Sequence, residues 1–139
     1  MAYAQILIID ENDRARALLA KQLTDLAYDV HTAKSLSEAL AKLKTATANN
    51  EPYECICLGP MEHTSGLGYD VIYNIRHAGK HHKETLIIGA SHDESFWRPM
   101  RNEDFFLTVR YGFTKTNESA WDTHTLRDYL PIPKAMAVI

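Results

Sequence analysis

Short apolar runs alternate along this chain with longer segments in which apolar residues recur at helical spacing. The first run, residues 6–9, is apolar throughout and ends at Asp10. A strand without polar alternation must be covered on both faces, as it is in a parallel sheet flanked by helices. Because the alternation continues toward the end of the sequence, we expect an α/β fold.

The pattern predicts five strands in series, with a helix after most of them. The expected strands are residues 6–9, 28–33, 53–58, 86–88 and 109–114. The expected helices cover about residues 15–26, 36–43, 71–78 and 118–130. Residues 92–107 are expected to form a short helix or an irregular segment.

Capping residues mark two of the helix starts. Asn12 or Asp13 can cap the first helix. Ser35 and Glu38 have the spacing of a capping box at the start of the second.

Length and composition limit the function classes. The 139 residues predict a single domain, with a core at about 4–130 and a tail at 131–139. A net charge of −3 predicts no nucleic-acid surface, and the longest apolar runs are too short to span a membrane or to form a secretory signal. We therefore expect a cytoplasmic protein, in which Cys55 and Cys57 remain reduced because they share one face of a strand.

Polar residues stand where the first and last expected strands end. Asp10 and Glu11 follow the first strand, and Lys115 follows the fifth. Together with residues 28–30 leading to 38–40, these segments resemble, in their order and spacing, a response-regulator receiver domain.

That resemblance implies a flavodoxin-like (CheY-like) fold, a doubly wound sheet of five parallel strands in the order 2-1-3-4-5 with helices on both faces. It also implies a site at the carboxyl edge of the sheet. In active receivers the acidic pair holds Mg²⁺, and an Asp on the third strand accepts phosphate from a histidine kinase. A Ser or Thr and a Lys then contact the phosphoryl group, and an aromatic residue on the fifth strand changes its burial.

This chain departs from the receiver pattern at linked positions. Gly59 stands where the phosphoacceptor Asp belongs, and Ala90 stands where the Ser or Thr belongs, although Ser91 could substitute after a one-residue slip of register. Gly112 replaces the switching aromatic residue, and Thr116 replaces the proline that follows the lysine. Glycine offers no nucleophile, so an aspartyl phosphate cannot form at position 59.

The resemblance and its departures together predict an atypical receiver, or pseudo-receiver, of two-component (phosphorelay) signalling. We expect it to act by protein–protein contact, without enzyme activity and without a required cofactor. Asp10 and Glu11 would bind Mg²⁺ weakly at most, or would pair with Lys115. The expected partner is a histidine kinase or a downstream effector, with no nucleic acid and no membrane; a homodimer is a further alternative.

The expected contact surface comprises the fourth helix, the fifth strand and the fifth helix, as is common among receivers. Tyr111, Phe113 and Trp121 are its candidate contact residues, because aromatic residues are enriched at interfaces.

Two alternative functions remain open. The chain could accept phosphate on a non-standard acid, for which Glu62, Asp93 and Glu94 are the candidates. It could also be a flavodoxin-like binder of a small ligand, although the first strand is not followed by the Ser/Thr-rich loop that a flavin phosphate needs.

Weaker motifs have simpler interpretations. His77, His81 and His82 could suggest zinc, but a solvated helix end is the better interpretation. Residues 65–68 could cradle an anion, but they resemble an ordinary turn into the third helix, which Asp70 would cap.

Overall fold

The computed structural model describes most of the chain. The described residues are 4–60, 68–78, 80–92, 97, 100, 102–116 and 118–131. Their helices are α1 (Asp13–Asp25), α2 (Leu36–Ala48), α3 (Gly68–Arg76), α4 (Thr123–Tyr129) and the 3₁₀ helix η1 (Lys80–His82). Their strands are β1 (Gln5–Ile9), β2 (Asp29–Ala33), β3 (Cys55–Leu58), β4 (Leu86–Ser91), β5 (Phe106–Phe113) and β6 (Ser119–Trp121).

The strands form one sheet in the order β2-β1-β3-β4-β5-β6, in which all neighbours are parallel except β5 and β6. The expected order of the first five strands is confirmed. The expected count of five was wrong, because the chain turns back after Phe113 and adds β6 where a helix was predicted. Backbone and side-chain bonds between Thr114 and Glu118 close this turn.

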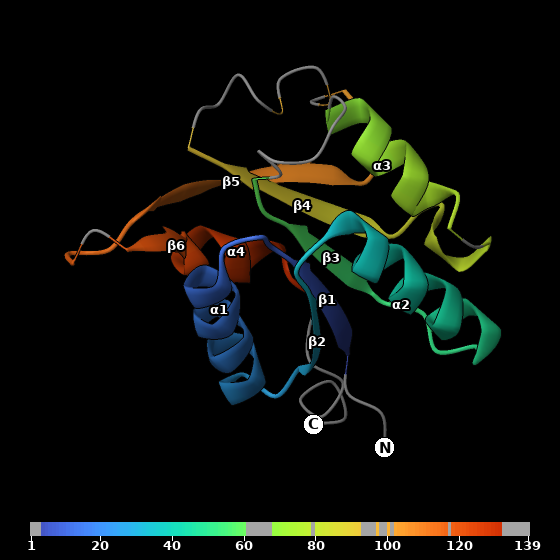
Figure 1. Ribbon diagram of the computed structural model, residues 1–139, viewed down its shortest axis with the longest axis horizontal. Helices are drawn as coiled ribbons and strands as arrows, with labels where there is room; N and C mark the ends of the chain where they lie inside the picture. Colours follow the sequence, from blue (N-terminus) through green and yellow to red (C-terminus); the bar gives the residue numbers. More distant parts are fainter. Residues whose placement is uncertain are drawn as a thin grey trace.

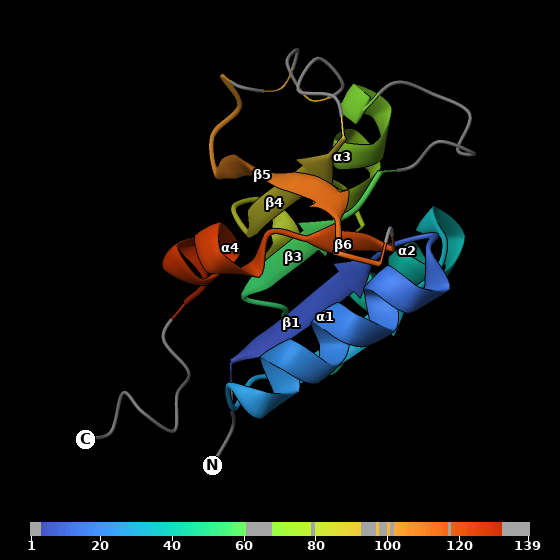
Figure 2. The same cartoon turned by 90° about the vertical axis from the view of Figure 1, so that its left-hand side faces the viewer.

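Helices lie against the two faces of the sheet (Figure 1). Leu7 and Ile9 of β1 point to the face covered by α2 and α3, whereas Ile6 and Ile8 point to the face that carries α1 and α4. Figure 2 shows α1 in front of the sheet, with α4 next to β6, the edge strand. The uninterrupted apolar run of β1 is therefore explained by burial on both sides.

The connection from β4 to β5 differs from the expected fourth helix. Among the residues described there, 97, 100 and 102–104 belong to no α-helix. Trp97 is buried, and its Nε1 donates to the Ala90 carbonyl at 2.9 Å. Its ring lies against Gly89, where an added Cβ would meet Phe106 and Trp97 at 2.9–3.0 Å. A large aromatic residue thus covers this part of the sheet.

Cys55 and Cys57 are both free thiols and are buried on β3. No helix in the described part of the chain is long and apolar enough to cross a membrane.

The predicted caps are present. Asn12 caps α1, with its Oδ1 accepting from the Ala15 N–H at 2.9 Å, and the Ser35 hydroxyl accepts from the Glu38 N–H at 3.1 Å.

Ser35→Ala is expected to lower the free energy of unfolding by about 1 kcal/mol, because it removes the acceptor at the start of α2. Urea denaturation measures the change. Ser37→Ala, inside the same helix, is the matched control and should stay within about 0.5 kcal/mol of the parent. Equal losses in both variants would contradict the capping role.

Candidate functional site

The carboxyl edge of the sheet brings Asp10 and Gly59 together. Asp10 follows β1, and its N–H donates to the Ala33 carbonyl of β2 at 3.0 Å. Gly59 follows β3, and its N–H donates to the Ile9 carbonyl at 2.7 Å. Parallel strands place their ends side by side, so residues 49 positions apart in sequence become neighbours.

The Asp10 side chain is buried, at 1% exposure, and hydrogen-bond donors contact both of its oxygens. Oδ1 accepts from the Asn12 N–H at 2.9 Å and from the Tyr111 hydroxyl at 3.5 Å. Oδ2 accepts from the Trp121 indole Nε1 at 2.9 Å. A buried carboxylate needs hydrogen-bond partners in place of water. Here β5 and β6 supply donors that replace the hydrogen bonds that water would form with an exposed carboxylate.

Burial raises the pKa of Asp10 above its usual value, and the donors oppose this rise. The opposing groups are the Asn12 N–H, Trp121, Tyr111 and the charge of Arg16. Arg16 also donates to the backbone carbonyl of Asp10 at 2.8 Å. Desolvation, rather than a neighbouring negative charge, therefore dominates the electrostatics of this carboxyl group.

The Asp10 carboxylate fills the space beside Gly59. A Cβ built on Gly59 would lie 2.8 Å from Asp10 Cγ and 2.9 Å from its Oδ2. Real Cβ atoms do not approach other atoms this closely, so any larger residue requires Asp10 to move. The absence of a side chain at Gly59 and the inward position of Asp10 are thus one packing arrangement.

Two residues predicted to face a partner are instead part of this site. Tyr111 and Trp121 are 3% and 6% exposed, so they are not available as surface contacts. They pair across the hairpin as Cα partners, which directs both aromatic donors toward Asp10. Phe113, the third predicted contact residue, is 66% exposed. Its ring stacks on His92, with centroids 4.8 Å apart.

The remaining predicted residues are dispersed along the edge. Ala90 is buried within β4, and Ser91, the last residue of that strand, is partly exposed. Lys115 is exposed in the turn between β5 and β6. Trp121 and Tyr111 contact the acidic residue where the sequence suggested a lysine.

A small polar cleft of about 220 Å³ opens beside Asp10. It is lined by Asp10, Glu11, Asn12, Pro60, His92, Tyr111 and Ser119.

Mg²⁺, which the receiver resemblance implies, does not fit these residues well. Both Asp10 oxygens already accept from protein donors, and position 59 provides no third carboxylate. Mg²⁺ requires several oxygen ligands in near-octahedral geometry. Within the described residues, no three His, Cys, Asp or Glu side chains gather closely enough to hold a metal ion.

The three histidines do not converge. His77 is exposed and stacks on Tyr73. The solvated position expected for His82 was wrong, because this ring is fully buried and its Nε2 accepts from the Tyr53 N–H at 3.3 Å. Burial lowers the pKa of His82, which favours the neutral ring that this bond needs.

Glu62, Asp93, Glu94 and residues 65–67 lie outside the described residues, as does the side chain of Asp70.

Solved structures of receiver proteins share this architecture. Chemotaxis protein CheY4 of Vibrio cholerae, crystallized at pH 4.0, matches with a TM-score of 0.68 and 21% identity over 93% of this chain and 100% of that one. The receiver domain of the histidine kinase CKI1 from Arabidopsis thaliana, complexed with Mg²⁺, matches with a TM-score of 0.61 and 19% identity over 77% of this chain and 82% of that one.

The chain has the CheY-like receiver fold. The receiver domain of the hybrid histidine kinase CckA also matches, with a TM-score of 0.62 and 15% identity over 90% of this chain and 95% of that one. No family model matches the sequence, and no curated protein sequence matches it significantly. The assignment of the receiver fold therefore depends on structure.

Within this receiver fold, sequence reasoning located the strand edge and Asp10 but missed Trp121 as its partner. The available signal was the spacing of Tyr111 and Trp121 about the residues 114–118, which places them opposite each other if the segment is a hairpin.

Proposed function

We propose that this protein is a receiver-fold module of two-component signal transduction that acts by protein–protein contact, without phosphorylation at position 59. The similarity to CheY4 and to the receiver domains of CckA and CKI1 supports the signalling class. On this proposal the chain is not an enzyme, it works in the cytoplasm, and its partner is a histidine kinase or a downstream effector.

The position of the Asp10 carboxylate against Gly59 is the observation that carries the proposal. An acceptor needs a nucleophilic oxygen and room for a phosphoryl group, whereas here even a Cβ at position 59 would lie 2.8 Å from Asp10 Cγ and would require that side chain to move. In an active receiver, donors at this edge of the sheet neutralise the phosphoryl oxygens. Here two aromatic side chains, Tyr111 and Trp121, donate hydrogen bonds to Asp10.

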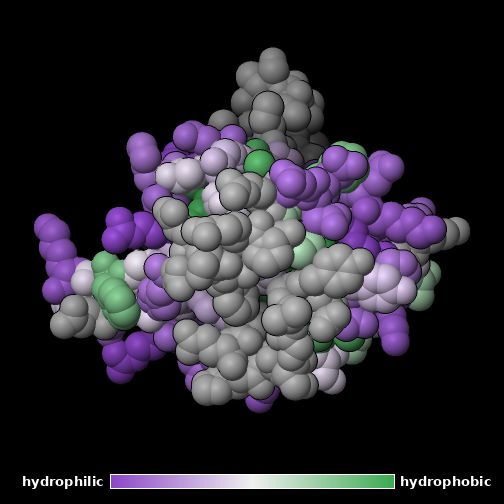
Figure 3. Space-filling view, turned by 90° about the horizontal axis from the view of Figure 1, so that it is seen from above, coloured by the Kyte–Doolittle hydropathy of each residue, from purple (hydrophilic) through white to green (hydrophobic). Residues whose placement is uncertain are grey.

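The exposed end of the β5–β6 hairpin is the contact surface that we propose. The hairpin projects from the body of the fold (Figure 1), and Figure 3 shows a hydrophobic group on a projection among hydrophilic side chains. Phe113 is two-thirds exposed although it is a large aromatic residue. Such residues contribute strongly to protein interfaces. A second copy of the chain is the alternative occupant.

Incubation with acetyl phosphate and Mg²⁺ tests the phosphorylation part of the proposal. We expect the intact mass to remain unchanged, because position 59 carries no acceptor. In parallel, beryllofluoride with Mg²⁺ should leave the ¹H–¹⁵N resonances of Asp10, Gly59 and Trp121 in place. A receiver domain with its acceptor Asp is the positive control under the same conditions.

A mass increase of one phosphoryl group would contradict the proposal and favour phosphorylation of a non-standard acid. Peptide mapping would then identify the residue, with Glu62, Asp93 and Glu94 as the candidates.

A further inference from the structure

His82 is a buried titratable residue at the end of the sheet opposite to Asp10. It belongs to η1, and its ring is fully buried beside Tyr53, which lies two positions before β3 begins. Asp10 lies at the carboxyl edge, so the two side chains belong to separate sites. Histidine is the residue whose charge changes most readily between pH 5 and pH 8, so a buried histidine can couple this end of the fold to pH.

The hydrogen bonds of His82 require its neutral form. The Tyr53 N–H lies 3.3 Å from Nε2, and a backbone N–H can only donate, so Nε2 carries no proton. Nδ1 lies 3.4 Å from the Thr47 hydroxyl of α2, so the ring proton is on Nδ1 and faces this oxygen. A second proton, on Nε2, would place two donors against each other. The charged ring therefore cannot keep the contact with Tyr53.

The other bonds that hold this segment do not titrate near neutral pH. Arg76 of α3 donates to the backbone carbonyls of His82, at 3.3 Å, and of Thr85. The Thr85 hydroxyl donates to the Tyr53 carbonyl at 3.4 Å. A guanidinium remains charged and a threonine hydroxyl remains neutral over this range. Among these bonds, the one between His82 and Tyr53 is therefore the one that a moderate change of pH can break.

The groups that face His82 do not offset a positive charge. The Thr47 hydroxyl comes from α2, the Arg76 guanidinium from α3, and His81 lies beside it on η1. Burial lowers the pKa of His82, and the charge of His81 lowers it further. Because these neighbours are neutral or basic, a proton on the buried ring costs both desolvation and repulsion.

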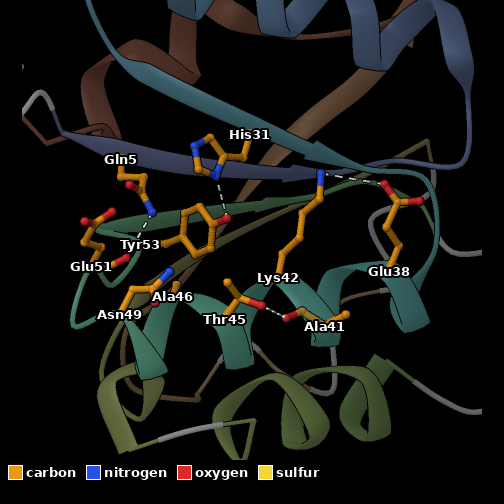
Figure 4. Close-up of a pocket in the computed structure, with 10 residues that line it drawn as sticks. All are labelled: Gln5, His31, Glu38, Ala41, Lys42, Thr45, Ala46, Asn49, Glu51 and Tyr53. Carbon is orange, nitrogen blue, oxygen red and sulfur yellow. Dashed lines mark hydrogen bonds and ion pairs between the residues drawn. The ribbon is translucent and has the colours of Figure 1, made fainter.

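The second histidine that contacts Tyr53 tolerates acid. The Tyr53 hydroxyl lies 2.7 Å from His31 Nδ1, and Figure 4 shows this bond, with the tyrosine ring between the strands and α2. The Nε2 atom of His31 lies 3.5 Å from the Asp29 carboxylate. A charged His31 can donate from both nitrogens, to the hydroxyl and to the carboxylate. Mild acid therefore leaves Tyr53 connected to β2 and acts on its connection to η1.

From this geometry we propose that His82 is a pH-sensitive latch. The neutral ring holds η1 against α2 and Tyr53, and protonation of Nε2 in mildly acidic solution releases η1. Release takes up one proton and breaks the hydrogen bond from the Tyr53 N–H. Neither the receiver assignment nor the phosphorylation state enters this inference, so it stands or fails independently of the proposed function.

Histidine ring resonances of the ¹⁵N,¹³C-labelled full chain test the protonation step. At about pH 8, His82 should show the neutral form with its proton on Nδ1. Its titration midpoint in the folded protein should lie below 6.5, the ordinary value. A midpoint at or above 6.5 would overturn the proposal, because the folded protein would then bind the proton as readily as a free side chain does.

Hydrogen exchange of the Tyr53 amide tests the release step. Its protection factor should fall by up to about tenfold for each pH unit below 6.5, because release binds one proton. At each pH it should also be lower than the protection factor of Ile8, which lies inside the sheet between β2 and β3. Equal protection of the two amides throughout would overturn the proposal, because the ring would then leave only when the whole fold opens.

Two substitutions separate titration from packing. His82→Gln offers a side-chain acceptor to the Tyr53 N–H but does not titrate, so the protection of Tyr53 should change by less than about twofold per pH unit. His77→Gln is the matched control, because His77 is exposed just after α3, and it should keep the full pH dependence of the parent. The same pH dependence in His82→Gln as in the parent would overturn the proposal. If His82→Gln does not fold, the ring titration and the comparison of Tyr53 with Ile8 in the parent still decide.

Discussion

Gly59→Asp is expected to destabilise the protein by about 3 kcal/mol or more and to leave it unphosphorylated at that position. The new Cβ alone would stand 2.8 Å from Asp10 Cγ, and such overpacking typically costs about 1–3 kcal/mol. A second carboxylate beside a buried one adds like-charge repulsion to this cost. Restoring the residue of an active receiver therefore does not restore the receiver site.

Urea denaturation at neutral pH measures the loss, and intact mass after acetyl phosphate treatment measures the chemistry. Gly59→Ala carries the steric part without the charge and should lose less stability. Gly112→Asp is the matched control, because a Cβ there meets its nearest neighbour, Arg110 Nε, at an ordinary 3.6 Å. A stable Gly59→Asp protein that takes up one phosphoryl group would disprove the account of this site.

The charge part should depend on pH in a defined direction. The two carboxyl groups raise each other's pKa in the folded state, so the folded protein binds protons more tightly than the unfolded chain. The destabilisation of Gly59→Asp should therefore be largest at neutral pH and shrink as the pH falls through the raised pKa values. The loss in Gly59→Ala should change much less over the same range.

The fold could be predicted from sequence where burial leaves a local pattern. Residues 6–9 are apolar at every position because alternate side chains enter different layers of the core, and this pattern requires a covered parallel strand. The cap at Ser35 was likewise predictable, because its partner Glu38 is only three positions away. Such signals depend on neighbours within one helical turn or one strand.

The arrangement around Asp10 could not be predicted in this way. The Trp121 indole that contacts it lies 111 positions along the chain, and no local spacing encodes that contact. In sequence, residues 119–121 also resemble the start of a helix. The strand that they form is short, and it is defined by its pairing with β5 rather than by a local pattern. The sequence therefore places these aromatic residues on the contact surface that is common among receivers. In the structure, Tyr111 and Trp121 instead donate hydrogen bonds to a buried carboxylate.

His82 illustrates the same limit at shorter range. Its spacing from His77 and His81 suggested either a metal site or a solvated helix end. In the structure the 3₁₀ turn η1 directs this ring inward, where it accepts the Tyr53 N–H from the segment before β3. The partner of a buried polar group decides its role, and that partner is set by tertiary contacts.

Trp121→Phe is expected to lower stability at pH 7 by about 1.5–3 kcal/mol, the usual effect of removing a hydrogen bond to a charged group. Phenylalanine retains an aromatic ring in the core but offers no donor to Asp10 Oδ2, which Nε1 now reaches at 2.9 Å. The pKa of Asp10, already raised by burial, should rise further in the variant because one of the groups that lowers it is lost.

The direction of the pH dependence follows from that raised pKa. A carboxyl group whose pKa is higher in the folded protein than in the unfolded chain favours folding most when the pH is below its unfolded pKa, which is ordinarily 3.8. This contribution to stability is lost as the pH rises through the folded pKa. The variant has the higher folded pKa, so the stability difference between variant and parent is greatest above both folded pKa values. It should narrow as the pH falls through them.

Urea denaturation of both proteins at pH 7 and near pH 4 measures this narrowing. Tyr111→Phe is the matched control: it removes a longer bond of 3.5 Å to the same carboxylate, and should show a smaller loss with the same pH trend. A loss in Trp121→Phe that is equal at both pH values would mean that the indole acts through packing alone. A loss that narrows at acidic pH would identify the buried carboxylate of Asp10 as the group that the β5–β6 hairpin holds in place beside Gly59.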